Sequence, residues 1–265
     1  EAHPEVLGIP NGREGIGRES NPDGRRRRTA LMRKPLIVSI VVVVLAGGVT
    51  AWWLTRDTAP PPMSVDDVSQ KESTGPTTSD LDGTWTVEQG SDSQAGLRIV
   101  EDRFGGLRDN TAVGRTPSVT GELSIAGTTV SSGSFRVDLS KIRFTDDPGV
   151  SVADRSKYLQ TKSLETDRFP DASFELTKPI RLSSPPRSGT SVVASATGDL
   201  TLHGITRSVT FDVEAKPVGS TVVLATADPV PVKLADHGID APEIPGLSKV
   251  RGTGEFEFLV VLRRT

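Results

Sequence analysis

Histidine is the residue type that could most readily support chemistry in this chain, because its side chain titrates near neutral pH and binds metals. The sequence contains three histidines, His3, His203 and His237. His3 belongs to an N-terminal stretch with almost no apolar run, whereas His203 and His237 each precede a glycine. Turn geometry explains a His-Gly pair better than catalysis does. We therefore expect no catalytic or metal-binding role for these histidines.

Other groups that could support catalysis or metal binding are also scarce. The chain has no cysteine, which excludes disulfides, thiolate metal sites and a thiol nucleophile. It contains no glycine-rich phosphate loop and no HExxH or GxSxG motif. The pairs Asp66-Asp67 and Asp146-Asp147 lack the spacing of a calcium-binding loop, so we interpret them as solvated loop acids. The sequence thus predicts a protein that is not an enzyme, with no catalytic residues and no metal.

Composition narrows the class of protein further. With 265 residues and a net charge of -3, the chain has room for one or two domains and gives no reason to predict nucleic-acid binding. Its 26 glycines and 19 prolines suit a β protein with many turns and some long unstructured segments.

The stretch Thr197–Phe211 is the clearest β-hairpin in the sequence. Apolar and polar residues alternate strictly on both sides of His203-Gly204, and a glycine at the second turn position allows the positive φ of a tight hairpin turn. With that turn, one face carries the pairs Leu202/Ile205, Leu200/Arg207, Gly198/Val209 and Ala196/Phe211. The other face is hydroxylated or charged throughout. This pattern indicates an antiparallel sheet with one wet face.

Similar alternation extends through the C-terminal two thirds of the chain. It predicts strands at about 83–88, 95–101, 118–126, 128–139, 172–182, 190–202, 205–216, 219–230 and 250–263. One helix is expected over Ala153–Leu164, after the break at Asp147-Pro148-Gly149. This content favours an all-β domain at 81–265, a single eight-stranded antiparallel barrel with one short helix. A barrel of that size either fills with side chains or holds one small ligand.

The N-terminal 80 residues divide into three segments. Residues 1–34 end in a basic cluster and are expected to be a disordered cytoplasmic tail; Met32 is a possible true start of the chain. The uncharged run Leu36–Leu54 is close to the ~20 residues that span a bilayer, so we predict a transmembrane helix at 35–54. Residues 55–80 are rich in Pro, Ser, Thr and Asp and are expected to be a disordered linker.

The charges on either side of the apolar run predict its orientation. Basic residues precede it and the acidic linker follows Trp52-Trp53, so the positive-inside rule predicts a single-pass membrane protein whose C-terminal domain is extracytoplasmic. The competing interpretation is a cleaved signal peptide. The run is longer than a usual signal-peptide core and has no convincing cleavage site before the Trp pair, which favours the retained anchor.

Several motifs together resemble the bacterial YceI-like family over about Leu81 to Arg264. They are Gly83-Thr84-Trp85, Ala112-Val113-Gly114-Arg115-Thr116, Val119-Thr120-Gly121, Phe135-Arg136-Val137-Asp138, Leu159 through Phe169-Pro170-Asp171-Ala172-Ser173-Phe174, and the hairpin Thr197 to Arg207. The resemblance implies a lipocalin-like barrel, exported from the cytoplasm, whose apolar cavity holds a polyisoprenoid chain such as that of a quinone. Two positions depart from the family: Gln94-Ala95-Gly96 replaces a His-Ser pair, and Tyr158 replaces a helix histidine. Head-group contacts made by those family residues are therefore not carried over.

The candidate ligand-binding residues are aromatic and aliphatic side chains on inward faces of the predicted strands and on the helix. They are Trp85, Phe135, Tyr158, Leu159, Phe174, Leu200, Phe211, Phe256 and Phe258, with Arg207 as a rim residue or a cation for a polar head group. From the residues alone, a lined cavity and a solid core are equally good interpretations, and the resemblance favours the cavity.

The predicted function is non-enzymatic binding of an isoprenoid-type lipid at the membrane, for carriage or storage. No cofactor is expected other than a bound isoprenoid lipid or quinone, and the expected partners are the membrane and this lipid, with no nucleic acid. The alternative is a structural or partner-binding module of the envelope with a filled barrel.

Overall fold

The computed structural model describes residues 59–68, 81–103, 106, 108–144, 152–184, 186–244 and 248–265. The predicted basic tail at 1–34, the predicted transmembrane helix at 35–54 and much of the predicted linker lie outside the described residues. Within these described ranges, no helix combines the length and the apolar composition that crossing a bilayer requires.

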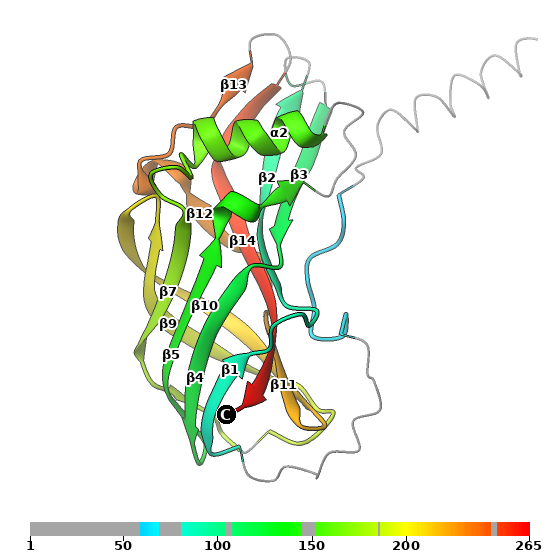
Figure 1. Ribbon diagram of the computed structural model, residues 1–265, viewed down its shortest axis with the longest axis vertical. Helices are drawn as coiled ribbons and strands as arrows, with labels where there is room; N and C mark the ends of the chain where they lie inside the picture. The colour runs from blue at the N-terminus through cyan, green and yellow to red at the C-terminus, as the bar shows by residue number, and fades with distance from the viewer. Residues whose placement is uncertain are drawn as a thin grey trace, which may run out of the picture. The chain divides into compact units, whose positions relative to one another are not determined.

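The domain is organised around a closed ring of antiparallel strands (Figure 1). Pairing of the first strand with the last closes the ring, with Trp85 opposite Arg264 and Val87 opposite Leu262. In ring order the eight strands are β1 (Gly83–Val87), β4 (Val119–Ala126), β5 (Thr129–Asp138), β7 (Asp171–Lys178), β9 (Val192–Leu202), β10 (Ile205–Val218), β11 (Thr221–Thr226) and β14 (Ser248–Arg264). The predicted eight-stranded antiparallel barrel is therefore confirmed.

The longest strand, β14, has different neighbours along its two halves. Its C-terminal half pairs with β1 and β11, and its N-terminal half pairs with β2, β12 and β13, with a register shift against β2 between Val250 and Gly254. The additional strands are β2 (Gln94–Arg103), β3 (Arg108–Thr116), β6 (Arg143–Phe144), β8 (Ile180–Arg181), β12 (Val230–Lys233) and β13 (Glu243–Ile244). β2, β3 and β13 extend the barrel wall at the end where the helix lies (Figure 1).

The predicted hairpin forms with the predicted register. β9 and β10 pair Leu202 with Ile205 and Ala196 with Phe211, and the turn residues His203 and Gly204 have φ of 52° and 72°. On the outer face, the hydroxyls of facing threonines hydrogen-bond to each other: Thr201 with Thr206 at 2.8 Å and Thr197 with Thr210 at 2.9 Å. A short turn with two positive φ values matches the twist of the strands that it joins.

The helix predicted over Ala153–Leu164 is present but changes geometry halfway. An α-helix, α2 (Val152–Tyr158), continues into a π-helical segment, η2 (Leu159–Ser163). The Leu164 N–H donates to the Leu159 carbonyl at 2.9 Å, which is the five-residue spacing of a π-helix. Leu159 and Leu164 are buried with residues of several strands and of the short helices: Ile99, Leu139, Ile142, Leu234, Ile239 and Val250. The helix thereby covers the end of the barrel (Figure 1).

The strand prediction differs from the structure in several places: the short strands β6 and β13 were not predicted, and the strand predicted at 172–182 is divided into β7 and β8. β3 was not predicted, because its two apolar residues, Ala112 and Val113, are consecutive and both buried, so the strand shows no alternation. The strand predicted at 219–230 is two strands, β11 and β12. Pro229 lies between them, and a proline cannot donate to a sheet ladder.

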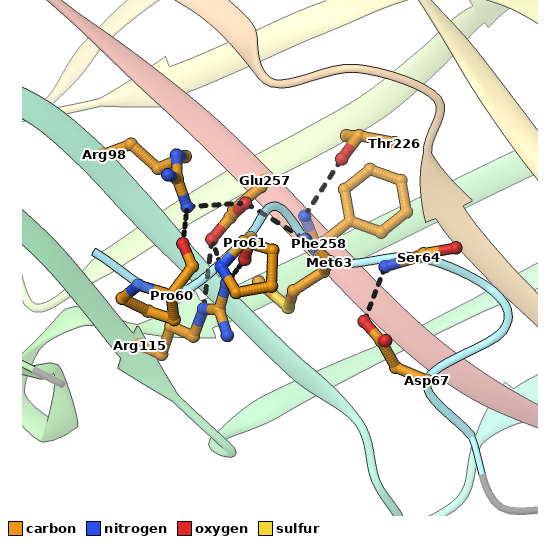
Figure 2. A network of polar contacts seen from close by, with 10 residues as sticks. All are labelled: Pro60, Pro61, Met63, Ser64, Asp67, Arg98, Arg115, Thr226, Glu257 and Phe258. Carbon is orange, nitrogen blue, oxygen red and sulfur yellow. Dashed lines mark hydrogen bonds and ion pairs between the residues drawn. The ribbon is translucent and has the colours of Figure 1, made fainter. Parts of the chain in front are cut away.

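Residues 59–68, expected to belong to a disordered linker, instead pack against the outer wall of the barrel. Met63 and Val65 are 4% and 3% exposed, in a cluster with Val223, Ala225 and Leu259 on β11 and β14. The carbonyls of Pro60 and Pro61 accept hydrogen bonds from Arg98 Nη1 at 2.9 Å and Arg115 Nη2 at 2.6 Å (Figure 2). We call this segment the strap. Its composition is that of a linker, but contacts with residues distant in sequence order it.

Three further short helices or turns complete the fold. They are η1 (Leu139–Lys141), η3 (Leu234–His237) and the turn at Gly238. Gly238 is the C-terminal cap of η3, and its left-handed backbone, with φ of 66°, terminates that helix. The Asp138 side chain caps η1 by accepting a hydrogen bond from the Ser140 N–H at 2.9 Å.

Candidate functional site

The inside of the barrel contains an apolar cavity of about 770 Å³. Its wall is formed by inward-facing residues of the ring strands together with α2 and η2; typical members are Val119, Leu123, Ile125, Val213, Leu224 and Val260. Alternation along each strand places these side chains inside and their polar neighbours outside. The barrel is therefore hollow over this region. This decides between the two interpretations of the inward aromatic residues, because a filled barrel would leave no such space.

Phenylalanines from four strands form one side of the cavity. Phe211 is central: its ring centroid lies 5.2 Å from those of Phe174 and Phe256, in edge-to-face arrangements, and 6.3 Å from that of Phe258. Phe135 stacks against Phe258 at 6.5 Å. Such contacts hold aromatic rings in defined orientations while leaving apolar faces toward the empty space.

Gly198 on β9 makes room for one of these rings. A Cβ atom at this position would lie 2.4 Å from Cζ of Phe174 and 2.3 Å from the carbonyl oxygen of Glu175. Any side chain at residue 198 would therefore push Phe174 out of place. The absence of a side chain at Gly198 is therefore what allows the Phe174 ring to lie across β9.

Eight of the nine predicted ligand-binding residues border the cavity. They are Phe135, Tyr158, Leu159, Phe174, Leu200, Phe211, Phe256 and Phe258. Trp85 is the exception: it is 1% exposed, packs in the core where β1 closes the ring, and its indole N–H donates to the Leu81 carbonyl at 2.9 Å. The alternation of residues on β1 predicted that Trp85 points inward. It could not predict that the pairing of β1 with β14 would bury this side chain away from the cavity.

Arg207, predicted as a rim residue or a head-group cation, is exposed and does not border the cavity. Its Nη1 donates to the Thr206 carbonyl at 3.1 Å. Although Arg207 lies directly opposite Leu200 in the β9–β10 ladder, its long side chain reaches solvent.

A charged pair that the sequence did not reveal lies in the cavity wall beside α2. Arg155 Nη2 donates to Glu101 Oε1 at 3.2 Å, and these side chains are only 14% and 11% exposed. The Arg155 guanidinium also lies 4.3 Å from the centroid of the Phe144 ring. All three residues border the cavity. The alternation on β2 could have predicted that Glu101 faces the cavity, because Leu97 and Ile99 precede it at every second position. No sequence pattern indicated the direction of the Arg155 side chain.

His203 and His237 lie outside the cavity wall, in the hairpin turn and at the end of η3 respectively. His203 Nε2 is 3.0 Å from Glu165 Oε2, and its Nδ1 is 3.1 Å from the His237 carbonyl oxygen. His237 Nδ1 is in turn 3.0 Å from the carbonyl oxygen of Ile205. These contacts tie the hairpin turn to the segment that follows η2 and to η3. Throughout the part of the chain described by the structure, no three His, Asp or Glu side chains gather into a metal-binding group.

Comparison with known proteins gives one family and several similar folds. A family model described as the YceI-like domain matches residues 85–262. A polyisoprenoid-binding domain from Saccharophagus degradans is similar with a TM-score of 0.50 and 14% identity, over 68% of this chain and 98% of that one. BcnA from Burkholderia cenocepacia has a TM-score of 0.45 and 15% identity, over 63% of this chain and 95% of that one. The comparison with curated proteins found no match. At 14% identity, the first structure supports the barrel fold and nothing finer.

Proposed function

The chain belongs to the YceI-like family, and on that premise we propose that its barrel binds an apolar, isoprenoid-type lipid without chemical conversion, for carriage or storage at the membrane. The observation that carries this proposal is the cavity of about 770 Å³ with its aromatic and aliphatic wall. This volume lies in the range of about 300–1,000 Å³ typical of sites for small organic ligands. A similar fold is described as a polyisoprenoid-binding domain, which supports the choice of an isoprenoid chain among apolar ligands.

The energetics of such a cavity suit a hydrocarbon tail. Each buried methylene gains roughly 0.8 kcal/mol, so a few isoprene units offset the entropy lost on ordering the chain. The hydrophobic attraction is non-directional. We therefore expect the cavity to select ligands by the length and width of the hydrocarbon tail more than by its functional groups. The edge-to-face phenylalanines around Phe211 fix the width at that level of the cavity.

The cavity wall also supports a binding function rather than catalysis. Two ionisable side chains of its described residues, Arg155 and Glu101, hydrogen-bond to each other. A general base or nucleophile normally needs a free reactive atom with an orienting partner. An ion pair in which each group holds the other is poorly suited to that role.

The lipid is bound outside the cytoplasm, close to the bilayer that the chain itself enters. This part of the proposal rests on the sequence: the apolar run Leu36–Leu54, the basic residues before it and the acidic residues after it. A retained anchor keeps the barrel near the membrane from which an apolar ligand would come.

The proposal is tested by titrating a fluorescent prenyl probe into the full chain purified in a mild detergent. We expect saturable binding to the wild type and at least about tenfold weaker binding to Leu200→Trp, because the indole fills cavity space next to Phe174. Val193→Trp is the matched control, since Val193 lies on the same strand and is 60% exposed. Equal binding by the two variants, with melting temperatures near that of the wild type, would refute a cavity-bound ligand.

A further inference from the structure

One side of the helix at the barrel end faces solvent. Its exposed residues are Lys157 and Tyr158 of α2 and Thr161 and Lys162 of η2. Lys157 and Thr161 are four residues apart, as are Tyr158 and Lys162, which is the spacing of neighbours on one helix face. The opposite side of the helix, which includes Leu159, is buried against the barrel. The exposed side is therefore free to contact a partner.

This exposed side belongs to a basic surface. Lys141 of η1 and Arg143 of β6 are exposed as well, and none of the cations Lys141, Arg143, Lys157 and Lys162 forms an ion pair with a described residue. We call these four residues the basic face. The sequences of η1, β6, α2 and η2 contain one acidic residue, Asp154, so the positive charge of these elements is in excess.

Hydrogen bonds hold the elements of the basic face together. Gln160 Nε2 donates to the carbonyls of Ser140 and Ile142, both at 2.9 Å, and so joins η2 to η1 and its C-terminal cap. The Phe144 N–H donates to Ser156 Oγ at 3.0 Å, which joins β6 to α2. The cations of η1 and β6 are therefore held beside those of the helix, as one preformed surface.

Tyr158 connects this surface with the cavity. Among the described residues that border the cavity, Tyr158 alone is exposed, at 41%. A tyrosine suits the boundary between water and lipid, because its ring is apolar and its hydroxyl is polar. A ligand that entered beside this ring would pass from the surface directly into the apolar space.

A bilayer that contains anionic phospholipids fits both features. Its negative surface attracts clustered lysines and arginines, and its boundary accommodates a tyrosine ring. An acidic protein could also pair with the four cations. It would give no reason for the exposed tyrosine of the cavity wall to lie among them, whereas an apolar ligand that comes from a membrane does.

We propose that the basic face docks on the surface of a bilayer containing anionic phospholipids, so that the cavity exchanges its lipid with the membrane beside Tyr158. This inference deepens the proposed function and rests on it, because it assigns the surface through which the same ligand arrives. Lys157 and Lys162 contact phospholipid head groups, and they take no part in holding the ligand inside the cavity.

The test measures how close each end of the barrel comes to the bilayer. Because the chain has no cysteine, one introduced cysteine carries a fluorophore at a single known place. Thr161→Cys places the label on the exposed side of the helix. Ser188→Cys is the matched control, in the exposed loop between β8 and β9. That loop lies at the other end of the barrel, since β9 runs from it to the hairpin turn that contacts Glu165 after η2.

Each labelled full chain is reconstituted into phosphatidylcholine vesicles with or without about 30% phosphatidylglycerol, and quenching by spin-labelled phospholipids is recorded. We expect quenching at residue 161 to be at least about threefold stronger in the anionic vesicles than in the neutral ones, because the anionic surface attracts the basic face. Quenching at residue 188 should be weak in both. Raising NaCl to about 0.5 M should remove most of the difference at residue 161, because salt screens exposed charges.

Charge variants connect the docking to the basic face. Lys157→Gln combined with Lys162→Gln should reduce the effect of phosphatidylglycerol at residue 161 by at least about half. Lys178→Gln combined with Arg181→Gln removes the same charge from exposed positions towards the other end of the barrel and should leave that effect unchanged. Both double variants should bind the prenyl probe in detergent with the affinity of the wild type, since none of these residues borders the cavity.

The outcomes separate the inference from its premise. Equal quenching of the two labels, or quenching at residue 161 that does not depend on phosphatidylglycerol, would overturn the docking surface while the proposed function stands. Equal effects of the two double variants would assign the docking to overall charge and not to the basic face. If the wild type does not bind the prenyl probe saturably in detergent, the proposed function fails, and the exchange of lipid beside Tyr158 fails with it.

Discussion

Arg115 holds Glu257 with two hydrogen bonds to a single oxygen on the outer wall of the barrel (Figure 2). Its Nε and Nη2 atoms lie 3.0 Å and 2.9 Å from Glu257 Oε1. The Glu257 side chain is fully buried although it points away from the barrel interior. A buried carboxylate needs such partners, since its desolvation is otherwise too costly.

The strap is what buries this carboxylate. The Met63 N–H donates to the second oxygen, Glu257 Oε2, at 3.2 Å, and Arg98 Nη1 lies 3.7 Å from the same oxygen. Arg98 and Arg115 also donate to the carbonyls of Pro60 and Pro61. The strap thus shares one polar network with β2, β3 and β14, and we conclude that residues 59–68 belong to the folded unit.

The first prediction concerns the stability of this network. Glu257→Ala should lower the free energy of unfolding by about 3–5 kcal/mol, because it leaves two largely buried guanidinium groups without their shared partner. Chemical denaturation of the full chain measures the change. Glu122→Ala, at an exposed position, should change it by no more than about 0.5 kcal/mol. Similar effects of the two substitutions would mean that the network contributes little.

A second prediction concerns the apolar contact of the strap. Met63→Ala should destabilise the domain by about 2 kcal/mol or more, because the methionine is 4% exposed against Val223, Ala225 and Leu259. Pro62→Ala is the control within the strap; Pro62 is exposed, and its replacement should cost less than about 1 kcal/mol. A strap that only rests on the surface would instead give a small effect for both, in the same denaturation experiment.

The hairpin turn gives a third prediction. Gly204→Val should cost on the order of 1 kcal/mol or more, since residue 204 has φ of 72° and a Cβ there would lie 2.7 Å from Phe169 Cε1. His203→Asn should be tolerated better, because asparagine also accepts a positive φ. Melting temperatures rank the two variants. Loss of lipid binding in His203→Asn at an unchanged melting temperature would show that His203 has a role beyond the turn.

Local patterns predicted the ring of the barrel because its strands alternate over many residues. The β9–β10 register could be predicted residue by residue, since the glycine turn fixes which side chains face each other. β3 could not be predicted in this way, as Ala112 and Val113 are both buried. The packing of the strap could not be predicted either. Met63 contacts Glu257, which is 194 residues away in the sequence, and no residue near Met63 indicates that partner.

The candidate site was predictable where it depends on strand periodicity. Phe256 and Phe258 face the cavity because they alternate with Glu255 and Glu257 on β14. Arg155 lies on the helix, and its direction depends on how that helix crosses the barrel end. For Trp85 the pattern predicted the correct face of the strand. The side chain nevertheless does not border the cavity, because it is buried by its neighbours in the core.

A fourth prediction concerns the orientation of the chain in the membrane. Reporter enzymes fused after Ser79 should be active only on the extracytoplasmic side, because the basic residues before Leu36 oppose translocation of the N-terminus. The main cellular product should remain in the membrane fraction. Release of a soluble, N-terminally shortened form as the main product would instead indicate a cleaved signal peptide.

The most direct test of the account is to identify by mass spectrometry the lipids that co-purify with the full chain, for the wild type and for Leu200→Trp side by side. Lipids held around a membrane anchor should be common to both proteins, so the difference between them reports the cavity. The account predicts a prenyl lipid at near-stoichiometric amounts in the wild type and its loss in Leu200→Trp, with similar melting temperatures. Absence of any prenyl lipid from the wild type, or its full retention in Leu200→Trp, would contradict a lipid-binding barrel.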